Sequence, residues 1–201
     1  MTPRSRPRVA IVGSGFSGLC LAIRLGQTGL ADFTILEKAD RLGGTWRENT
    51  YPGAACDLMS FAYCFSFEQK SDWSRKWSPQ EEILAYMDHC AEKYGVLPHV
   101  RFGTEVVEAR FDAEAGLWRI RTRRDGREEE MEAEVLVSGV GQLHRPVSPK
   151  IPGLEGFEGA VFHSARWDHG VDLAGKRVGV VGHGASAIPF IPDIAPRVAA
   201  G

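Results

Sequence analysis

The amino-acid sequence predicts an α/β fold built on a parallel β-sheet, and three observations indicate this class. Short apolar runs occur at 9–12 and 135–137, and a mostly apolar one at 33–36, as expected for strands that are buried on both faces. Directly after the first run comes a glycine-rich turn, Gly13-Ser14-Gly15-Phe16-Ser17-Gly18. Apolar residues then recur at helical spacing over 19–25. Strand, turn, helix and second strand therefore fit within about 30 residues, the size of one βαβ unit.

The middle of the chain predicts a long loop, a helix and an antiparallel meander. Residues 43–77 have no sustained period but many aromatic side chains, which indicates an ordered functional loop. Ser78-Pro79-Gln80-Glu81 is typical of a capping box with proline at the first helical position, and the helix should stop near Gly95. The period then changes to two. The predicted strands are 104–110, 117–123 and 128–134, with a tight turn at Asp125-Gly126.

The last third of the chain predicts a linker and the start of a second βαβ unit. Prolines and glycines concentrate over 144–160, as in a crossing between domains. The apolar run 177–181 predicts another buried strand, which leads into Gly182-His183-Gly184-Ala185-Ser186 and a short helix. We therefore divide the chain into a first domain at 1–143, a linker at 144–174 and the beginning of a second, incomplete domain at 175–201.

Composition excludes several classes of function. The 201 residues carry a formal net charge of -2, which does not favour binding to nucleic acid. No run reaches the roughly 18 apolar residues of a membrane span, so we expect a soluble, cytoplasmic protein. The four cysteines form no C-x-x-C pair, and His89 and Cys90 have no partners at metal-ligand spacing. We expect no metal site.

The first glycine turn predicts a dinucleotide site of the Rossmann type. Its glycines allow the backbone to approach a pyrophosphate at the positive end of the following helix. Glu37, 19 residues past Gly18, ends the second strand, where a carboxylate can accept hydrogen bonds from a ribose 2′-OH. A 2′-phosphate is disfavoured there, which argues against NADP at this site. The pair Gly43-Gly44, just beyond Glu37, resembles the element that covers the flavin end of FAD, so we expect FAD.

The second glycine turn predicts a second nucleotide. Gly182 and Gly184 match the fingerprint, with alanine in place of the third glycine, a variation that it allows. Two such turns in one chain are what hydride transfer from a nicotinamide to a flavin requires. His183 is interpreted as a loop side chain beside the pyrophosphate, with a catalytic base as the alternative.

Between the two turns lies a longer motif that resembles a known family. Phe157-x-Gly159-x-x-x-His163-x-x-x-Trp167-Asp168 matches the Baeyer–Villiger fingerprint F-x-G-x-x-x-H-x-x-x-W-[PD] at every fixed position. Tyr51-Pro52-Gly53-Ala54-Ala55-Cys56-Asp57 resembles the segment of that family that faces the flavin. The chain over 8–201 thus resembles the N-terminal part of flavin-containing monooxygenases of the Baeyer–Villiger type. The stretch 141–154 is most similar to the branch that contains 4-hydroxyacetophenone monooxygenase.

The resemblance implies a reaction and a set of cofactor contacts. In this family NADPH reduces FAD, and a C4a-peroxyflavin transfers one oxygen of O2 to a ketone or a soft heteroatom, while the protein supplies position and electrostatics. It implies a Rossmann-like FAD domain with a meander, followed by the start of a Rossmann-like NADP domain. Carried over to this sequence, the FAD contacts are Gly13, Ser14, Gly15, Phe16, Ser17, Gly18, Glu37, Lys38, Gly44, Thr45, Trp46, Asp57, Tyr63, Val106 and Gln142. The NADPH contacts are Gly182, Gly184, Ala185 and Ser186.

Several interpretations stay open at this stage. Asp57 is the expected catalytic carboxylate near the flavin, with a local Asx turn as the alternative. His163 and Trp167 either act in a conformational change during NADPH handling or pack the domain crossover, and an acid–base pair of His163 with Asp168 has little support. The family is longer than this sequence and carries a catalytic arginine beyond Gly201. We therefore expect the 201-residue chain to be inactive alone, as a fragment or as half of an enzyme with a separately encoded C-terminal half.

The resemblance leaves alternative functions. An N- or S-oxygenating monooxygenase, of the N,N-dimethylaniline monooxygenase type, would share the same cofactor motifs, although Asp168 in the fingerprint favours Baeyer–Villiger chemistry. A non-catalytic flavin- or nucleotide-binding module is the other alternative. The identity of the small-molecule substrate is not readable from this sequence.

Overall fold

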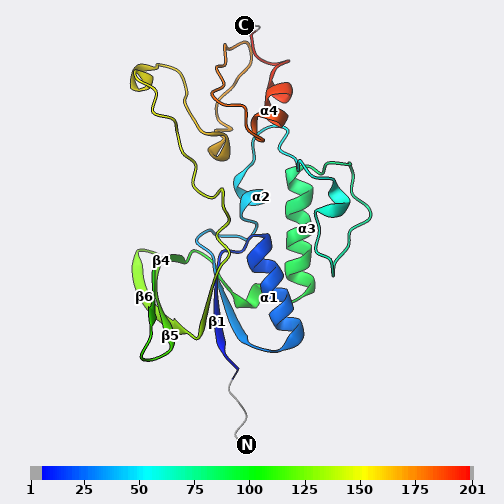
Figure 1. Ribbon diagram of the computed structural model, residues 1–201. Coiled ribbons are helices and arrows are strands. Elements are labelled where there is room, and N and C mark those ends of the chain that lie inside the picture. The colour runs from blue at the N-terminus through cyan, green and yellow to red at the C-terminus, as the bar shows by residue number, and fades with distance from the viewer. Residues whose placement is uncertain (1–5, 200–201) are drawn as a thin grey trace, which may run out of the picture. The chain divides into compact units, whose positions relative to one another are not determined.

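The computed structural model describes residues 6–199 and shows two compact units, each interrupted in sequence (Figure 1). The first unit holds the residues up to Thr45 together with Leu84–His144. The second holds Trp46–Ile83 together with the residues from Arg145 onward. Within the described residues, no helix is both long and apolar enough to cross a membrane.

A four-stranded parallel sheet forms the centre of the first unit and confirms the predicted fold class. Its order is β3 (Val100–Arg101), β2 (Asp32–Leu36), β1 (Arg8–Val12) and β7 (Val135–Ser138). The β1 side chains Ala10 and Ile11 are fully buried, as the continuous apolar run requires. The strand β3 was not predicted from the sequence, because two residues are too few to show a pattern.

Two helices belong to this fold. The helix α1 (Phe16–Thr28) directly follows the glycine turn, and it ends at Gly29, whose left-handed φ of 60° fits a glycine cap. The helix α3 (Gln80–Lys93) is followed by a short 3-10 helix at Leu97–His99. The rings of Phe16 and Tyr86 stack with their centroids 6.3 Å apart, so α1 and α3 lie side by side at this level (Figure 1).

The beginning of α3 differs from the predicted capping box. The carbonyl of Pro79 accepts the first helical hydrogen bond, from the N–H of Ile83 at 3.2 Å, so Pro79 is the cap and Ser78 lies one residue before it. The hydroxyl of Ser78 instead donates to Ser60 Oγ at 2.6 Å. Ser78 therefore fixes the preceding loop.

The predicted antiparallel meander is confirmed as a second sheet of the first unit. It consists of β4 (Glu105–Asp112), β5 (Leu117–Arg124) and β6 (Arg127–Ala133). Asp125 and Gly126 both have positive φ, 50° and 75°, as in a type I′ hairpin turn. Ile120 and Ala133 of the meander join Ala10 and Leu36 of the parallel sheet in one hydrophobic cluster. The meander thus covers part of the parallel sheet (Figure 1).

The second unit is mostly irregular, as predicted for the stretch 43–77. Its elements are short: α2 (Thr45–Glu48), whose first residue belongs to the first unit, 3-10 helices at Ser60–Ala62, Leu154–Gly156 and Ser164–Arg166, and α4 (Ala187–Ile194). The side chains of Ala187, Phe190 and Ile194 form a buried cluster against which Tyr51 and Trp167 pack. This cluster is the hydrophobic core of the unit's C-terminal part.

The predicted strand at 177–181 is wrong. The segment has no strand conformation, and Val178, Val180 and Val181 are 39%, 40% and 73% exposed. An apolar run forms a strand only when a neighbour pairs with its backbone groups. Within the described residues no strand lies beside this segment. The short helix predicted after it does form, as α4.

Candidate cofactor-binding sites

The first candidate site lies at the carboxyl edge of the parallel sheet. Val12 is in register with Leu36 on one side and with Ser138 on the other, so three strands end at the same level. The N–H of Gly13 donates to Leu36 O at 2.9 Å, and the N–H of Gly139 donates to Val12 O at 2.8 Å. Ligands of open α/β sheets bind at this edge.

Two glycines of the first turn are required by close backbone contacts. Gly13 has a φ of +95°, and a Cβ there would lie 2.8 Å from Gly139 O. A Cβ at Gly18 would lie only 2.0 Å from Gly13 O. A Cβ at Gly15 would meet only the Cα of Gly44, at 3.8 Å. Gly13 and Gly18 thus shape the turn, whereas Gly15 leaves its surface open.

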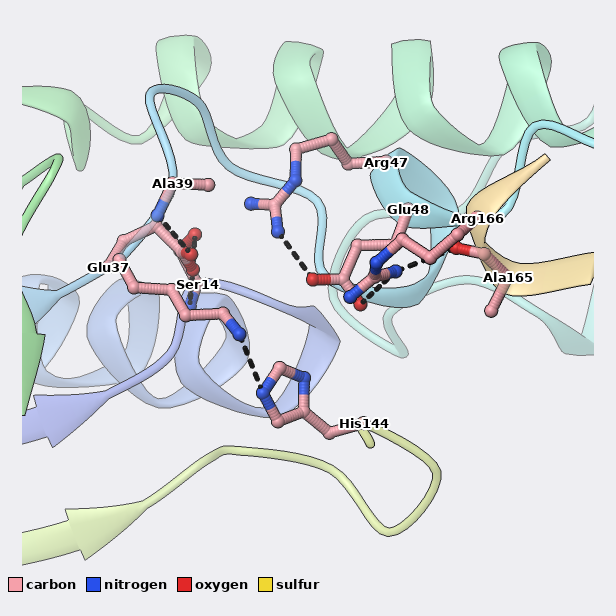
Figure 2. A network of polar contacts seen from close by, with 9 residues as sticks. Ser14, Glu37, Ala39, Arg47, Glu48, His144, Ala165 and Arg166 are labelled. Atoms are coloured by element: carbon pink, nitrogen blue, oxygen red, sulfur yellow. Dashed lines mark hydrogen bonds and ion pairs between the residues drawn. The ribbon is translucent and has the colours of Figure 1, made fainter. Parts of the chain in front are cut away.

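Glu37 is a buried carboxylate tied to the same turn (Figure 2). Its Oε2 accepts the N–H of Ser14 at 2.9 Å and the Ser14 hydroxyl at 2.6 Å, while Oε1 accepts the N–H of Ala39 at 3.0 Å. Glu37 is 5% exposed and Ser14 is 1% exposed. A charge buried to this degree needs such hydrogen bonds. They fix the acid at the end of β2 beside the glycine turn.

The N-terminus of α1 is suited to an anion. Gly15 occupies the cap position without a side-chain hydrogen bond, and the first turn of the helix contains no acidic residue. The positive end of the helix dipole therefore suits a phosphate. Ser17 is exposed at this end of the helix.

The other predicted FAD contacts of the first unit lie on separate elements. Gln142 is exposed after β7, and Val106 is half-buried in β4, where it packs against the cluster shared by the two sheets. Lys38 is exposed, and its Nζ lies 2.9 Å from His144 Nε2 (Figure 2). Sequence reasoning missed His144, because nothing in the local pattern connects residues 106 positions apart.

Trp46 and Tyr63 form a pair within the second unit. Trp46 Nε1 donates to Tyr63 Oη at 3.0 Å, and their rings meet edge to face with centroids 5.4 Å apart. Burial raises the pKa of the Tyr63 phenol, while the hydrogen bond from Trp46 lowers it. The side-chain amide of Gln80 donates to the Trp46 carbonyl. The structure thus brings together two residues that the sequence predicts as FAD contacts.

Asp57 lies on an anchored segment. The N–H of Cys56 donates to Ser78 O at 3.0 Å, and the N–H of Gln80 donates to Ala54 O at 2.8 Å. The Asp57 side chain itself is exposed. Burial raises the pKa of the Cys56 thiol, the Leu58 N–H opposes this, and the charge of Asp57 adds to the increase.

The fingerprint residues make mainly local contacts. His163 Nδ1 accepts the N–H of Ala165 at 3.1 Å, and Asp168 Oδ1 accepts the N–H of Gly170 at 2.9 Å. Phe157 is 61% exposed, and its ring lies where a Cβ at Gly159 would stand. His163 and Asp168 therefore each stabilise a turn of their own.

Trp167 is the fingerprint residue with long-range contacts. Its ring meets Phe162 edge to face at 5.2 Å and Phe190 at 5.4 Å, and Phe190 in turn meets Tyr51 at 6.0 Å. This aromatic row connects the linker, α4 and the segment that precedes Asp57. Phe190 was not predicted from the sequence.

A partly buried ion pair near Trp46 was also not predicted from the sequence. Arg47 and Glu48 pair at 2.9 Å with side chains only 13% and 14% exposed, and Arg166 Nη1 lies 3.9 Å from Glu48 Oε2 (Figure 2). The pairing joins α2 to the 3-10 helix of the fingerprint. Charged residues with no regular spacing gave no sequence signal for it.

The first residues of the second glycine turn, 182–185, are exposed. Gly182 has a φ of +107°, and a Cβ at Gly182 or Gly184 would meet nothing within 4 Å. Ser186 is the cap residue of α4, and the N–H of Ala187 donates to Gly184 O at 2.9 Å. Ala185 is exposed. The turn keeps an open backbone before a helix, as a nucleotide turn needs.

These features define a class. A parallel sheet, a glycine turn with positive φ at its carboxyl edge and a buried acid at the end of the next strand are those of a dinucleotide-binding α/β protein. The family model described as Flavin-binding monooxygenase-like matches residues 6–200. The chain therefore belongs to the flavin-binding monooxygenase-like family.

Individual relatives agree with this assignment. A Baeyer-Villiger monooxygenase of Streptomyces coelicolor is 51% identical over 191 residues, which cover 95% of this chain and 36% of the relative. An oxidized steroid monooxygenase bound to NADP has a TM-score of 0.84 at 41% identity, covering 94% of this chain and 37% of that one. OTEMO in complex with FAD and NADP has a TM-score of 0.86 at 32% identity, covering 98% and 38%. The chain thus spans little more than a third of the length of these relatives.

Proposed function

We propose that the chain binds FAD at the first glycine turn and NADPH at the second, as the N-terminal part of a Baeyer–Villiger monooxygenase. Such an enzyme would insert one oxygen atom of O2 into a ketone. The observation that carries the proposal is the buried Glu37, which is hydrogen-bonded to the glycine turn at the carboxyl edge of the sheet. The names of the relatives support the reaction.

The residues of the first unit fit the ADP half of FAD. Gly15 presents backbone without a side chain at the positive end of α1, which suits a pyrophosphate. Glu37 ends β2, where its carboxylate suits a ribose hydroxyl. We assign residues 1–143 to FAD, 144–174 to the linker that carries the fingerprint, and 175–201 to NADPH.

The family resemblance assigns Trp46, Tyr63 and Asp57 to the flavin end of the cofactor. FAD, once reduced by NADPH, supplies the activation of O2 and the transfer of one oxygen atom. Trp46 and Tyr63 would orient the ring system, since their mutual hydrogen bond fixes both side chains. Asp57 would set the charge near the reacting atoms, since its carboxylate is exposed on a segment whose backbone is hydrogen-bonded to Ser78 and Gln80.

Retention of FAD tests the binding step. The purified chain is mixed with excess FAD and desalted, and its visible spectrum is recorded. We expect flavin absorption bands that survive desalting in the wild type and are lost in Gly15→Ala, which retains the far-ultraviolet circular dichroism of the wild type. A wild-type chain that retains no flavin would contradict the proposal.

Product analysis tests the reaction. The chain, mixed with or joined to the C-terminal part that its relatives carry, is supplied with FAD, NADPH, O2 and either a cyclic ketone or a thioether, and products are identified by mass spectrometry. A lactone would support Baeyer–Villiger chemistry, whereas a sulfoxide without any lactone would favour an N- or S-oxygenating enzyme. We propose that turnover needs the part of the relatives that this chain does not match, as a separate C-terminal half or as further sequence. Steady lactone formation by the 201-residue chain alone would contradict this requirement.

A further inference from the structure

The segment that leads to Asp57 packs directly against α4. Gly53 lies in the second unit with a φ of +71°. A Cβ at this position would lie 2.7 Å from the backbone carbonyl oxygen of Pro189 and 3.3 Å from Asp193 Cβ. Backbone atoms of a helix cannot move aside locally as the end of a flexible side chain can. Any residue larger than glycine would therefore push α4 away from the turn.

Neighbouring contacts hold the same two segments together. Tyr51 meets Phe190 of α4 edge to face at 6.0 Å, and Phe190 is only 7% exposed. Trp167 of the fingerprint contacts the same ring at 5.4 Å. Thr50 Oγ1 lies 2.8 Å from His169 Nε2, one residue after the fingerprint. The close approach at Gly53 thus belongs to a continuous packed contact.

The contact joins two of the predicted functional segments. The second glycine turn, 182–186, leads directly into α4, so a shift of this helix carries the turn with it. Asp57 follows Gly53 by four residues, and the intervening Ala54 and Cys56 are hydrogen-bonded to the backbone at 78–80. We propose that Gly53 is a positioning residue: its missing side chain lets α4 dock on the turn 51–53, which fixes the second glycine turn relative to the segment that carries Asp57.

The identity of the ligand at the second turn, NADPH, rests on the proposed function, but the docking contact does not. Two other glycines of the same unit provide controls for the effect of Gly53→Ala on α4. Gly153 also has a positive φ, +83°, but a Cβ there would meet nothing within 4 Å. Gly156 has neither a positive φ nor a close neighbour. Gly153→Ala therefore measures the effect of backbone strain alone, and Gly156→Ala that of the added methyl group alone. Only Gly53→Ala also displaces α4.

Hydrogen–deuterium exchange of the purified chain measures the docking. In Gly53→Ala we expect the amides of α4 to exchange about tenfold faster than in the wild type, because the helix loses its packed neighbour. Gly153→Ala and Gly156→Ala should leave the exchange of α4 unchanged. Equal rates in Gly53→Ala and the wild type would overturn the proposal. So would an equal acceleration in Gly153→Ala, since strain alone would then explain the effect.

Ligand titration measures the consequence for the second turn. We expect Gly53→Ala to weaken NADP+ binding about tenfold, or about 1.4 kcal/mol, and to weaken FAD binding by less. A wild-type chain that does not bind NADP+ would contradict the proposed function at this turn, while the exchange experiment would still decide the docking. Unchanged NADP+ affinity in Gly53→Ala, with binding present in the wild type, would overturn the positioning role.

A second variant keeps the test decisive if Gly53→Ala does not fold. Phe190→Leu keeps an apolar side chain in the cluster but removes the ring that meets Tyr51 and Trp167. We expect the same pattern: faster exchange in α4, weaker NADP+ binding and a smaller change in FAD affinity. Exchange and affinity both equal to the wild type in Phe190→Leu would overturn the proposal.

Discussion

Glu37 and Ser14 are joined by two hydrogen bonds to one carboxylate oxygen, from the Ser14 N–H at 2.9 Å and from its hydroxyl at 2.6 Å. The acid at the end of β2 therefore fixes the conformation of the glycine turn that follows β1. Shape and charge of the candidate FAD site depend on the same side chain. This dual dependence leads to the first prediction.

Replacing Glu37 by glutamine should weaken FAD binding while the protein stays folded. Hydrogen bonds to a charged group contribute about 1.5–3 kcal/mol each, and glutamine retains the shape without the charge. We expect FAD affinity to fall by about 10- to 100-fold, since 1.4 kcal/mol corresponds to a factor of ten. Quenching of flavin fluorescence on titration gives the dissociation constant.

Ser14→Ala serves as the matched control, because it removes the hydroxyl donor and keeps the N–H donor. We expect a smaller loss of FAD affinity than in Glu37→Gln. An unchanged dissociation constant in Glu37→Gln would show that this carboxylate has no part in binding the cofactor.

Two glycines of the same turn should respond in opposite ways to alanine. In Gly18→Ala the new Cβ would lie 2.0 Å from Gly13 O, so the contact of α1 with the turn must open. In Gly15→Ala the Cβ meets only Gly44 Cα at 3.8 Å, and the residue's negative φ of -73° suits alanine. We expect Gly18→Ala to lose about 1–3 kcal/mol of stability or more, the usual range for overpacking.

Urea denaturation and flavin retention together measure this pair. Gly15→Ala should unfold at nearly the wild-type urea concentration but retain little FAD, because its methyl group faces the expected pyrophosphate position. Equal stability of the two variants would contradict the packing argument for Gly18.

The first glycine turn and the meander could be predicted because their signals are local. Positive φ at Gly13 and at Asp125-Gly126 follows from residue type and short spacing alone. The strand predicted at 177–181 failed because a pattern shows only the preference of a segment, whereas a strand also needs a partner. Contacts such as Lys38 with His144, or Gly53 with Pro189, join positions more than a hundred residues apart. One amino-acid sequence alone does not indicate which distant residues will come into contact, so these contacts could not be predicted.

Tyr63 should titrate above the ordinary pH range of a tyrosine. Burial raises its pKa above the ordinary value near 10, and the hydrogen bond from Trp46 partly opposes this increase. A difference-absorbance titration near pH 10 should show a late component that disappears in Tyr63→Phe. Trp46→Phe should move this component to still higher pH, because it removes the donor that stabilises the phenolate. A shift to lower pH would contradict the assigned hydrogen bond.

The raised pKa of Tyr63 also makes the stability of the protein depend on pH. The folded-state pKa of Tyr63 is raised, so the folded protein holds its proton after the unfolded chain has lost it. The contribution of Tyr63 to stability is therefore fully present below about pH 10 and is lost as the pH rises through the folded pKa. Between pH 9 and pH 11, the wild type should lose stability more steeply than Tyr63→Phe, as measured by urea denaturation at each pH. Parallel losses would contradict the shift.

The stability of the meander should depend on its buried apolar residues far more than on its exposed ion pairs. Ile120 is fully buried in the cluster with Ala10 and Leu36, and truncation of such a residue to alanine costs about 2–5 kcal/mol. Arg121, the next residue, pairs with Glu108 at 2.6 Å and Glu128 at 2.8 Å, but on an exposed face. Exposed pairs add little because water and salt screen them. We expect Ile120→Ala to lower the urea midpoint strongly and Arg121→Ala to leave it near the wild-type value, with the small effect of Arg121→Ala vanishing at high salt. A loss in Arg121→Ala equal to that in Ile120→Ala would show that the ion pairs within the meander stabilise the protein as much as the buried cluster does.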